Sequence, residues 1–253
     1  PGQWGAIVFL SETDNNWIKY ATIKNASIGL FMQPFELYQD NPVNIGSPKI
    51  LIENSQFYNH SNVGILGRNA TITGKNVVIN NCGEAALACT FGGNYNFTHA
   101  TINNSFNSTK QTALVLNDYR KKSQTTFDTK ILQANFNNCI IYGSNSRNIF
   151  LDKKGSGFNF TFDHCLIKFS SQNVVLENPE LYNFTNNLWY KNSSITDNST
   201  IHNPKYKNVN RNQLWPTQNL NLPFNSLYAN GLLDINEKSR SSNVNLGAYQ
   251  TIP

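Results

Sequence analysis

The chain has 253 residues, of which 14% are charged and 39% hydrophobic, with a net charge of +5 and a pI near 9.0. A chain of this length can bury a sizeable core, as one elongated domain or as two compact ones. The positive charge is dispersed and forms no long Lys/Arg block, so nucleic acid is not indicated as a partner. No apolar run approaches the ~18 to 20 residues of a membrane span, so we expect none.

The chain opens at Pro1 and enters strand-like sequence at once, QWGAIVFL, so we expect that an N-terminal part is missing. Short runs of Ile, Val, Phe and Tyr, punctuated by Asn, Ser and Gly, follow along the whole chain, and runs of helical period are scarce. Asn favours turns and tolerates left-handed backbone. The sequence therefore predicts an all-β fold.

One short frame recurs: an aromatic residue or Ile, a polar residue, Asn or His, a small residue, any residue, and Ile. The copies are IKYATI, IENSQF, INNCGE, FTHATI, FNNCII, FDHCLI and the looser FTNNLW, with small residues Ala21, Ser55, Cys82, Ala100, Cys139, Cys165 and Asn187. These small residues are ~18 to ~39 residues apart, a range in which repeats indicate stacked structural units. A fixed frame with variable spacing is typical of the coils of one β-solenoid with loop insertions.

A second frame follows the first within each coil, as VGIL, LACT, LVLN, IFLD and VVLE. Because side chains alternate along a strand, the middle residues should point outward, namely Gly64, Ala88, Val115, Phe150 and Val175. Most of these residues are apolar, and an exposed sheet would avoid them. We expect the apolar residues of the C-terminal segment to cover them, namely Trp215, Leu220, Leu222, Phe224, Leu227 and Tyr228.

These repeats, with Asn at a sharp turn beside a small inward residue, resemble the right-handed parallel β-helix of the pectate-lyase-like superfamily. The stretch DINEKSRSSNVNLGAYQ (residues 234–250) is similar to the tail DxxGxxR…DIGAYE of secreted and surface-attached bacterial β-helix proteins, and NPKYKN (residues 203–208) resembles the DPxFxN segment before that tail. This chain departs from that pattern at three positions. It has Glu237 where the pattern has Gly, Asn245 where the pattern has Asp, and Gln250 where the pattern has Glu. The resemblance implies a secreted protein or one at the bacterial cell surface.

The cysteines and histidines fit the repeat better than they fit catalysis. Cys82, Cys139 and Cys165 take the same inward position as Ala, and Cys89 takes a Leu or Ile position of the second frame. A buried free thiol packs as a small hydrophobe. Two histidines, His99 and His164, stand where other copies have Asn54, Asn81 and Asn138. We therefore predict core thiols and turn residues, and no metal site.

Loops after the second frame carry the most suggestive charges. They hold Arg68, Tyr119, Arg120, Lys121, Lys122, Lys153 and Lys154, which stacking in register would bring to one edge. Charge runs usually only keep a surface soluble. The alternative is a wall that binds an acidic polysaccharide, with Tyr119 as a surface for a sugar ring.

We predict coils of a right-handed parallel β-helix over residues 1–202 and an irregular segment over residues 203–253 that packs on them. The expected function is polysaccharide binding, without a cofactor. One alternative is a polysaccharide lyase, for which the resemblance implies a Lys or Arg acting on a uronic acid and in which Ca²⁺ would take part, or a glycoside hydrolase. The scattered Asp and Glu residues weaken the hydrolase reading, because glycoside hydrolysis uses paired carboxylates. A structural adhesin or stalk is the third hypothesis.

Overall fold

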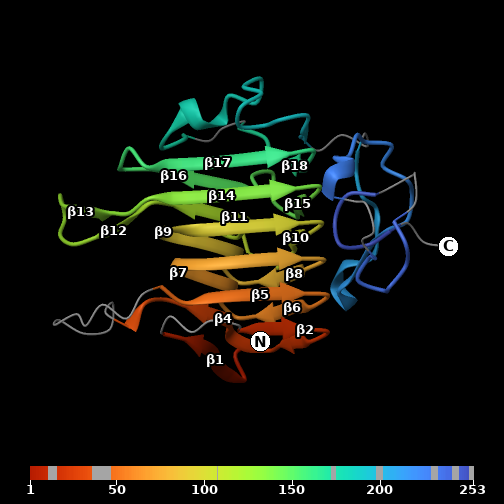
Figure 1. Cartoon of the computed structure of the whole chain (residues 1–253), viewed down its shortest axis with the longest axis horizontal. Coiled ribbons are helices and arrows are strands. Elements are labelled where there is room, and N and C mark those ends of the chain that lie inside the picture. Colours follow the sequence, from red (N-terminus) through yellow and green to blue (C-terminus); the bar gives the residue numbers. More distant parts are fainter. Residues whose placement is uncertain are drawn as a thin grey trace.

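The computed structural model describes residues 1–10, 16–35, 47–106, 108–171, 175–197, 202–228, 233–240 and 245–250. Strands make up 52% of the structure and helices 5%, which confirms the all-β prediction. Most strands pair in parallel and stack along the molecule, an arrangement consistent with a β-solenoid (Figure 1).

The parallel strands present three faces. Two long strands, β7 (Val63–Lys75) and β9 (Ala85–Thr98), bend so that their first halves belong to face 1 and their second halves to face 2. Face 1 also contains β1 (Trp4–Phe9), β4 (Ala26–Met32), β11 (Thr112–Asn117) and β16 (Ile149–Asp152). Face 2 also contains β2 (Trp17–Lys19), β5 (Lys49–Glu53), β14 (Leu132–Asn137) and β17 (Phe158–Asp163). Face 3 consists of β3 (Thr22–Lys24), β6 (Gln56–His60), β8 (Val78–Cys82), β10 (Thr101–Asn104), β15 (Ile140–Gly143), β18 (Leu166–Lys168) and β19 (Ser194–Thr196).

The chain visits face 1, face 2 and face 3 in turn and then begins the next coil. An antiparallel hairpin of β12 (Tyr119–Lys121) and β13 (Phe127–Thr129) is inserted between face 1 and face 2. The remaining elements are η2 (Pro179–Tyr182), and, in the C-terminal segment, β20 (Tyr206–Asn208), η3 (Val209–Arg211), β21 (Gln213–Pro216) and η4 (Ser226–Tyr228).

A ladder of left-handed residues forms the turn between face 2 and face 3. Its members have φ between 48° and 53° and are Tyr20, Asn54, Asn76, His99, Asn138, His164 and Asn192. Each is followed by Ala, Ser or Cys, or by Val77 in one coil. Asn and His tolerate this conformation because a short polar side chain can form local hydrogen bonds. We call the residue that follows each turn residue the rung. In the copies IKYATI, IENSQF, FTHATI, FNNCII and FDHCLI, the turn residue and the rung occupy the positions predicted from the sequence.

Two copies of the frame were assigned in the wrong register. Val78 pairs with Thr101, so the turn residue of that coil is Asn76 and its rung is Val77, whereas Cys82 lies at the end of face 3 beside His60. The predicted copy FTNNLW is not a turn of the ladder. The sequence YKNSSI, residues 190–195, supplies that turn through Asn192 instead.

The second frame is confirmed for the outward Ala88, Val115 and Phe150, which lie in one row. Leu66, not Gly64, shares that row, because Leu66 pairs with Ala88. Val175 is not in a strand and is 94% exposed. Val174 of the same predicted strand lies outside the described residues.

The described residues of the C-terminal segment that pack on the coils lie on face 3, whereas they were predicted to lie on face 1, so the predicted position is wrong. Leu220 and Leu246 pack on Ile140 and Leu166, while Leu222 and Phe224 are partly buried in the same cluster. Trp215, Leu214 and Tyr249 pack around Val78. Leu227 and Tyr228 are exposed. The physical reason is that face 3 also has outward apolar residues, and the segment follows the last strand of that face.

Hydrogen bonds of Asp234 and Arg240 hold the end of the C-terminal segment in place. Asp234 accepts backbone N–H groups of Asn236, Lys238 and Gln250. The buried Arg240 guanidinium donates to Asn76 at 3.0 Å and to the carbonyl of Gly247 at 2.9 Å. Glu237 has φ +61°, a conformation that favours glycine. Among the described residues, no helix is long and apolar enough to cross a membrane.

Candidate functional site

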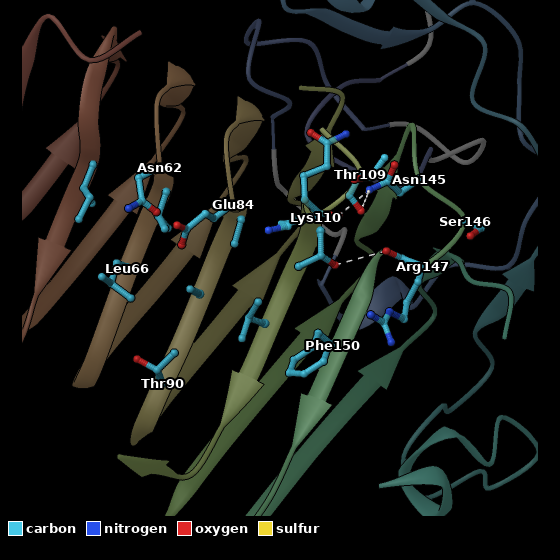
Figure 2. Close-up of a pocket in the computed structure, with 17 residues that line it drawn as sticks. Asn62, Leu66, Glu84, Thr90, Thr109, Lys110, Asn145, Ser146, Arg147 and Phe150 are labelled. Carbon is cyan, nitrogen blue, oxygen red and sulfur yellow. Dashed lines mark hydrogen bonds between the residues drawn. The ribbon is translucent and has the colours of Figure 1, made fainter. Parts of the chain in front are cut away.

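A groove of about 780 Å³ runs across the outer side of face 1 (Figure 2). Its floor consists of apolar residues from β4, β7, β9, β11 and β16, namely Ile28, Val63, Leu66, Ala85, Ala88, Val115 and Phe150. These residues point outward because their strand neighbours, such as Ile65 and Leu114, fill the core. Strands ~4.8 Å apart give such a groove a length of about 19 Å.

One long side of the groove is a wall built from the turns that lead into face 1. Asn145 Nδ2 donates to the carbonyl of Gln111 at 2.7 Å, and Gln111 Nε2 donates to Ser144 Oγ at 2.5 Å. Thr112 Oγ1 donates to the carbonyl of Arg147 at 3.4 Å. These bonds join the turns of successive coils, so the wall is held in place by the coils themselves.

The wall carries the charges of the groove. The Arg147 guanidinium lies 5.4 Å from the centre of the Phe150 ring, which places a cation beside the aromatic residue of the floor. Lys110 lies on the same wall, and Glu84 is the carboxylate among the lining residues (Figure 2). An apolar floor with Arg and Lys at its side can pack against the C–H face of a sugar and bind a carboxylate.

The predicted loop-edge cations lie elsewhere, where face 1 meets face 2, and the structure pairs several of them with carboxylates. Arg120 and Lys122 contact Asp128 at 3.0 Å and 3.7 Å. Lys153 contacts Glu180 at 3.2 Å, and Lys154 contacts Asp152 at 3.7 Å.

Tyr119 and Lys154 are brought together, with the ammonium 5.7 Å from the ring centre. Tyr119 donates to Asp152 Oδ2 at 2.6 Å, and burial, followed by this hydrogen bond, raises the pKa of Tyr119. Arg68 lies on β7 and donates to Gln33, whereas Lys121 is exposed on the hairpin. This edge is therefore a mixture of cations and carboxylates.

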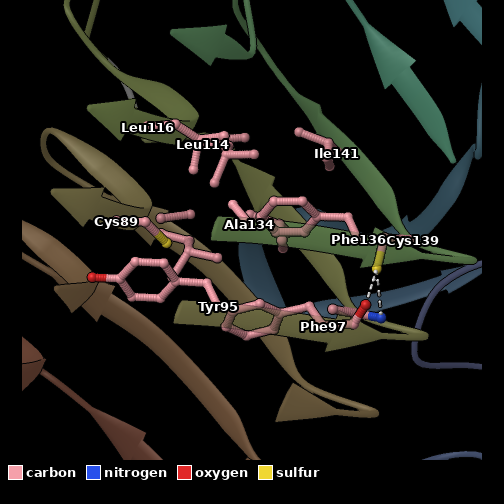
Figure 3. Close-up of a cluster of buried hydrophobic side chains, with 14 of the residues drawn as sticks. Cys89, Tyr95, Phe97, Leu114, Leu116, Ala134, Phe136, Cys139 and Ile141 are labelled. Carbon is pink, nitrogen blue, oxygen red and sulfur yellow. Dashed lines mark hydrogen bonds between the residues drawn. The ribbon is translucent and has the colours of Figure 1, made fainter. Parts of the chain in front are cut away.

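The four cysteines are buried free thiols, as predicted. Figure 3 shows Cys89 and Cys139 among the side chains of the core. Cys139 Sγ lies 3.4 Å from the N–H nitrogen of Ala100, and it donates to backbone carbonyls. Burial raises the pKa of the thiols of Cys82, Cys89 and Cys165. A protonated, inaccessible thiol is a poor nucleophile.

The histidines also serve the fold. His99 is buried beside Asn138 in the ladder, and His60 is buried beside Cys82. Burial lowers the pKa of His60 to about 4 and that of His99 well below its usual value. His164 contacts Asp163, which Lys191 and Asn225 also contact. Within the described ranges, no group of three or more His, Cys, Asp and Glu residues is placed to hold a metal ion.

Sequence reasoning found the outward apolar row but missed the wall. Lys110, Gln111, Asn145 and Arg147 lie in turns that differ in length from coil to coil, and their meeting depends on how the coils stack. The available signal was that each of these turns directly precedes a copy of the second frame. Comparisons with family models, with curated proteins and with solved structures found no match to this chain.

Proposed function

We propose that this chain is a right-handed parallel β-helix protein that binds a polysaccharide in the groove of face 1. The observation that carries the proposal is the groove itself, an apolar floor beside a polar, cationic wall. Ligand sites commonly combine an apolar lining with a few polar groups that fix the orientation. A groove of about 19 Å across stacked strands suits an extended chain.

The polar wall supports a sugar ligand. Asn62, Thr90, Asn145 and Ser146 line the groove with amide and hydroxyl groups. Such groups recognise hydroxyls without requiring a charged ligand.

The charges favour an acidic polysaccharide over a neutral one. Arg147 and Lys110 lie on the wall, and the guanidinium can bind a carboxylate with two hydrogen bonds. At the loop edge, carboxylates of the protein already pair with the cations Arg120, Lys122, Lys153 and Lys154. Those carboxylates do not line the groove. We therefore rank the groove above the loop edge as the site for an acidic polysaccharide.

The groove favours binding over hydrolysis. Hydrolysis of a glycosidic bond uses two carboxylic groups about 5 to 10 Å apart, and Glu84 is the carboxylate among the described lining residues. Elimination from a uronic acid needs a base and a cation that neutralises the carboxylate; among the groove residues Lys110 is the candidate base and Arg147 the candidate cation. The lyase is therefore the second candidate, and Ca²⁺ remains part of that alternative alone.

Binding should be measured by calorimetry with polygalacturonate, alginate and a neutral β-glucan. We expect the acidic polymers to bind and the affinity to fall as salt rises past ~0.1 M. The variant Arg147→Gln/Phe150→Ala should lose binding, whereas Arg120→Ser/Lys121→Ser/Lys122→Ser at the loop edge is the matched control and should retain it. The reverse pattern would move the site to the loop edge. Absorbance of an unsaturated product would establish the lyase.

We further propose that the protein is secreted or attached to a bacterial surface, with a structural adhesin as the alternative function. Secretion or attachment to a bacterial surface is supported by the likeness of residues 234–250 to the tail of such proteins. A protein that binds none of the polymers and forms stable oligomers through face 1 would favour the adhesin. Light scattering at several concentrations tests this point.

A further inference from the structure

The outer side of face 2 carries a regular set of uncharged polar side chains. On four neighbouring strands, β7, β9, β14 and β17, two outward residues flank one buried residue. The outward residues, which we call the polar array, are Thr71, Thr73, Asn94, Asn96, Gln133, Asn135, Asn159 and Thr161. The buried residues between them are Ile72, Tyr95, Ala134 and Phe160.

The array has two fixed repeats. Paired residues on neighbouring strands, such as Thr73, Asn96 and Asn135, recur at the strand spacing of ~4.8 Å. The two outward residues of one strand are about 6.6 Å apart, since a strand rises ~3.3 Å per residue. In Figure 1 these strands run side by side in nearly the same direction. The side chains therefore form a grid.

Hydrogen bonds within the array fix the amides. Asn96 Nδ2 donates to Asn94 Oδ1 at 2.9 Å, and Asn135 Nδ2 donates to Asn96 Oδ1 at 2.8 Å. Gln133 Nε2 donates to Asn135 Oδ1 at 3.2 Å. A primary amide has two N–H donors, so each of these amides keeps one for a ligand. Side chains that are already ordered lose less entropy on binding.

We propose that the polar array binds the surface of an ordered, uncharged polysaccharide. Sugar hydroxyls both donate and accept, which matches a grid of amides and hydroxyls, whereas an anionic ligand would require cations. An ordered solid presents hydroxyls at regular intervals, so many weak contacts form together and their effects multiply. A single mobile chain would lose conformational entropy for each contact.

The edge of the array supports a sugar ligand. The row of Thr73 continues through Leu51 to Trp17, whose side chain is 63% exposed. These residues, with Thr71 and Lys49, line a shallow hollow. The Lys19 ammonium lies 4.9 Å from the centre of the Trp17 ring, and the remaining exposed part of the indole offers an apolar surface for a sugar ring beside the hydrogen-bonding grid. This surface lies on another face than the groove and takes an uncharged ligand, so it is independent of the proposed function.

The test is a pelleting assay of the whole chain with microcrystalline cellulose and with chitin powder. We expect the protein to pellet with at least one solid, with little dependence on salt. The variant Thr71→Val/Thr73→Val keeps β-branched residues and removes two hydroxyls, and Asn96→Asp/Asn135→Asp keeps the shape and removes amide donors. Each should reduce the affinity about tenfold or more, as expected for two lost hydrogen bonds.

Matched controls separate this site from the groove. Arg147→Gln/Phe150→Ala should pellet like the unchanged protein, and a protein that fails to bind acidic polymers but still pellets would overturn the groove alone. If Asn96→Asp/Asn135→Asp unfolds, the threonine variant decides. The proposal is overturned if neither solid pellets the protein, or if the folded array variants pellet fully. Shaping of ice crystals without pelleting would also overturn it, because the grid would then order water.

Discussion

The two kinds of buried cysteine should respond differently to serine, which tests the rung positions of the fold. At the Cys139 rung, other coils already hold serine. Ser55 Oγ lies 3.1 Å from the nitrogen of Ala21 and 2.8 Å from the carbonyl of Glu53. Ser193 Oγ lies 2.9 Å from the nitrogen of Cys165 and 2.9 Å from the carbonyl of Phe162. A hydroxyl at this position therefore finds a donor and an acceptor.

Cys139 has the same surroundings, with Sγ 3.4 Å from the nitrogen of Ala100 and 3.3 Å from the carbonyl of Asn137. We expect Cys139→Ser to cost less than about 1 kcal/mol, since the buried hydroxyl is satisfied. Cys89 is fully buried in the apolar core, in one row with Gly67 and Leu116 of the neighbouring strands. There Cys89→Ser should cost about 1 to 3 kcal/mol, because the hydroxyl lacks a partner.

Urea unfolding measures the difference as a shift in midpoint at a common slope. The variants Cys139→Ala and Cys89→Ala control for the loss of the sulfur atom at each site. Equal losses for the two serine variants would refute the reasoning. They would show that the rung of Cys139 does not offer the hydrogen bonds seen at Ser55 and Ser193.

Replacing Glu237 with Gly should stabilise the protein by about 0.5 to 1 kcal/mol, because Glu237 has φ +61°; a lower unfolding midpoint would contradict this. Acid should destabilise the fold as pH falls from ~6.5 to about 4, because the folded-state pKa of His60 is lowered to about 4 and that of His99 is also lowered. Above pH ~6.5 these histidines are neutral in both the folded and the unfolded protein, so they add no pH dependence there. His60 alone lowers the free energy of unfolding by up to about 3 kcal/mol at the acid end. A melting temperature that stays constant between pH ~6.5 and about 4 would contradict this prediction. Deleting the chain from Asn203 onward should expose the outer side of face 3 and give binding of a hydrophobic dye. A truncated protein that stays monomeric and equally stable would show that face 3 needs no such cover.

The repeat could be read from the sequence because core positions tolerate few residue types. Cys139, Cys165 and Ala100 follow a left-handed Asn or His, and this local chemistry is visible in the sequence. The register failed in the coil of β8 because both of its turns contain a left-handed Asn, namely Asn76 and Asn81. A six-residue frame cannot distinguish them, since the choice depends on pairing with the neighbouring coils.

The candidate sites were predictable only in part, for the same reason. The apolar outward row needs only the alternation of a strand, and Val115 and Phe150 were placed correctly from it. To predict the wall of the groove, one must know where Lys110 and Arg147 lie relative to each other, and these residues belong to turns of different coils. The loop edge was predicted from its cations, but the partner carboxylates Asp128 and Glu180 are set by the hairpin and by η2.

The three faces share one core and differ in what they present outward. Face 3 presents Ile140 and Leu166, and the C-terminal segment buries them. Face 2 presents the polar array, which water can solvate. Face 1 presents Leu66, Val115 and Phe150 to an open groove, although burying such side chains would contribute about 1.5 to 3 kcal/mol each. Because the described part of the C-terminal segment packs on face 3, it leaves the partly buried apolar row of face 1 to line the groove, which is where we propose that a polysaccharide binds.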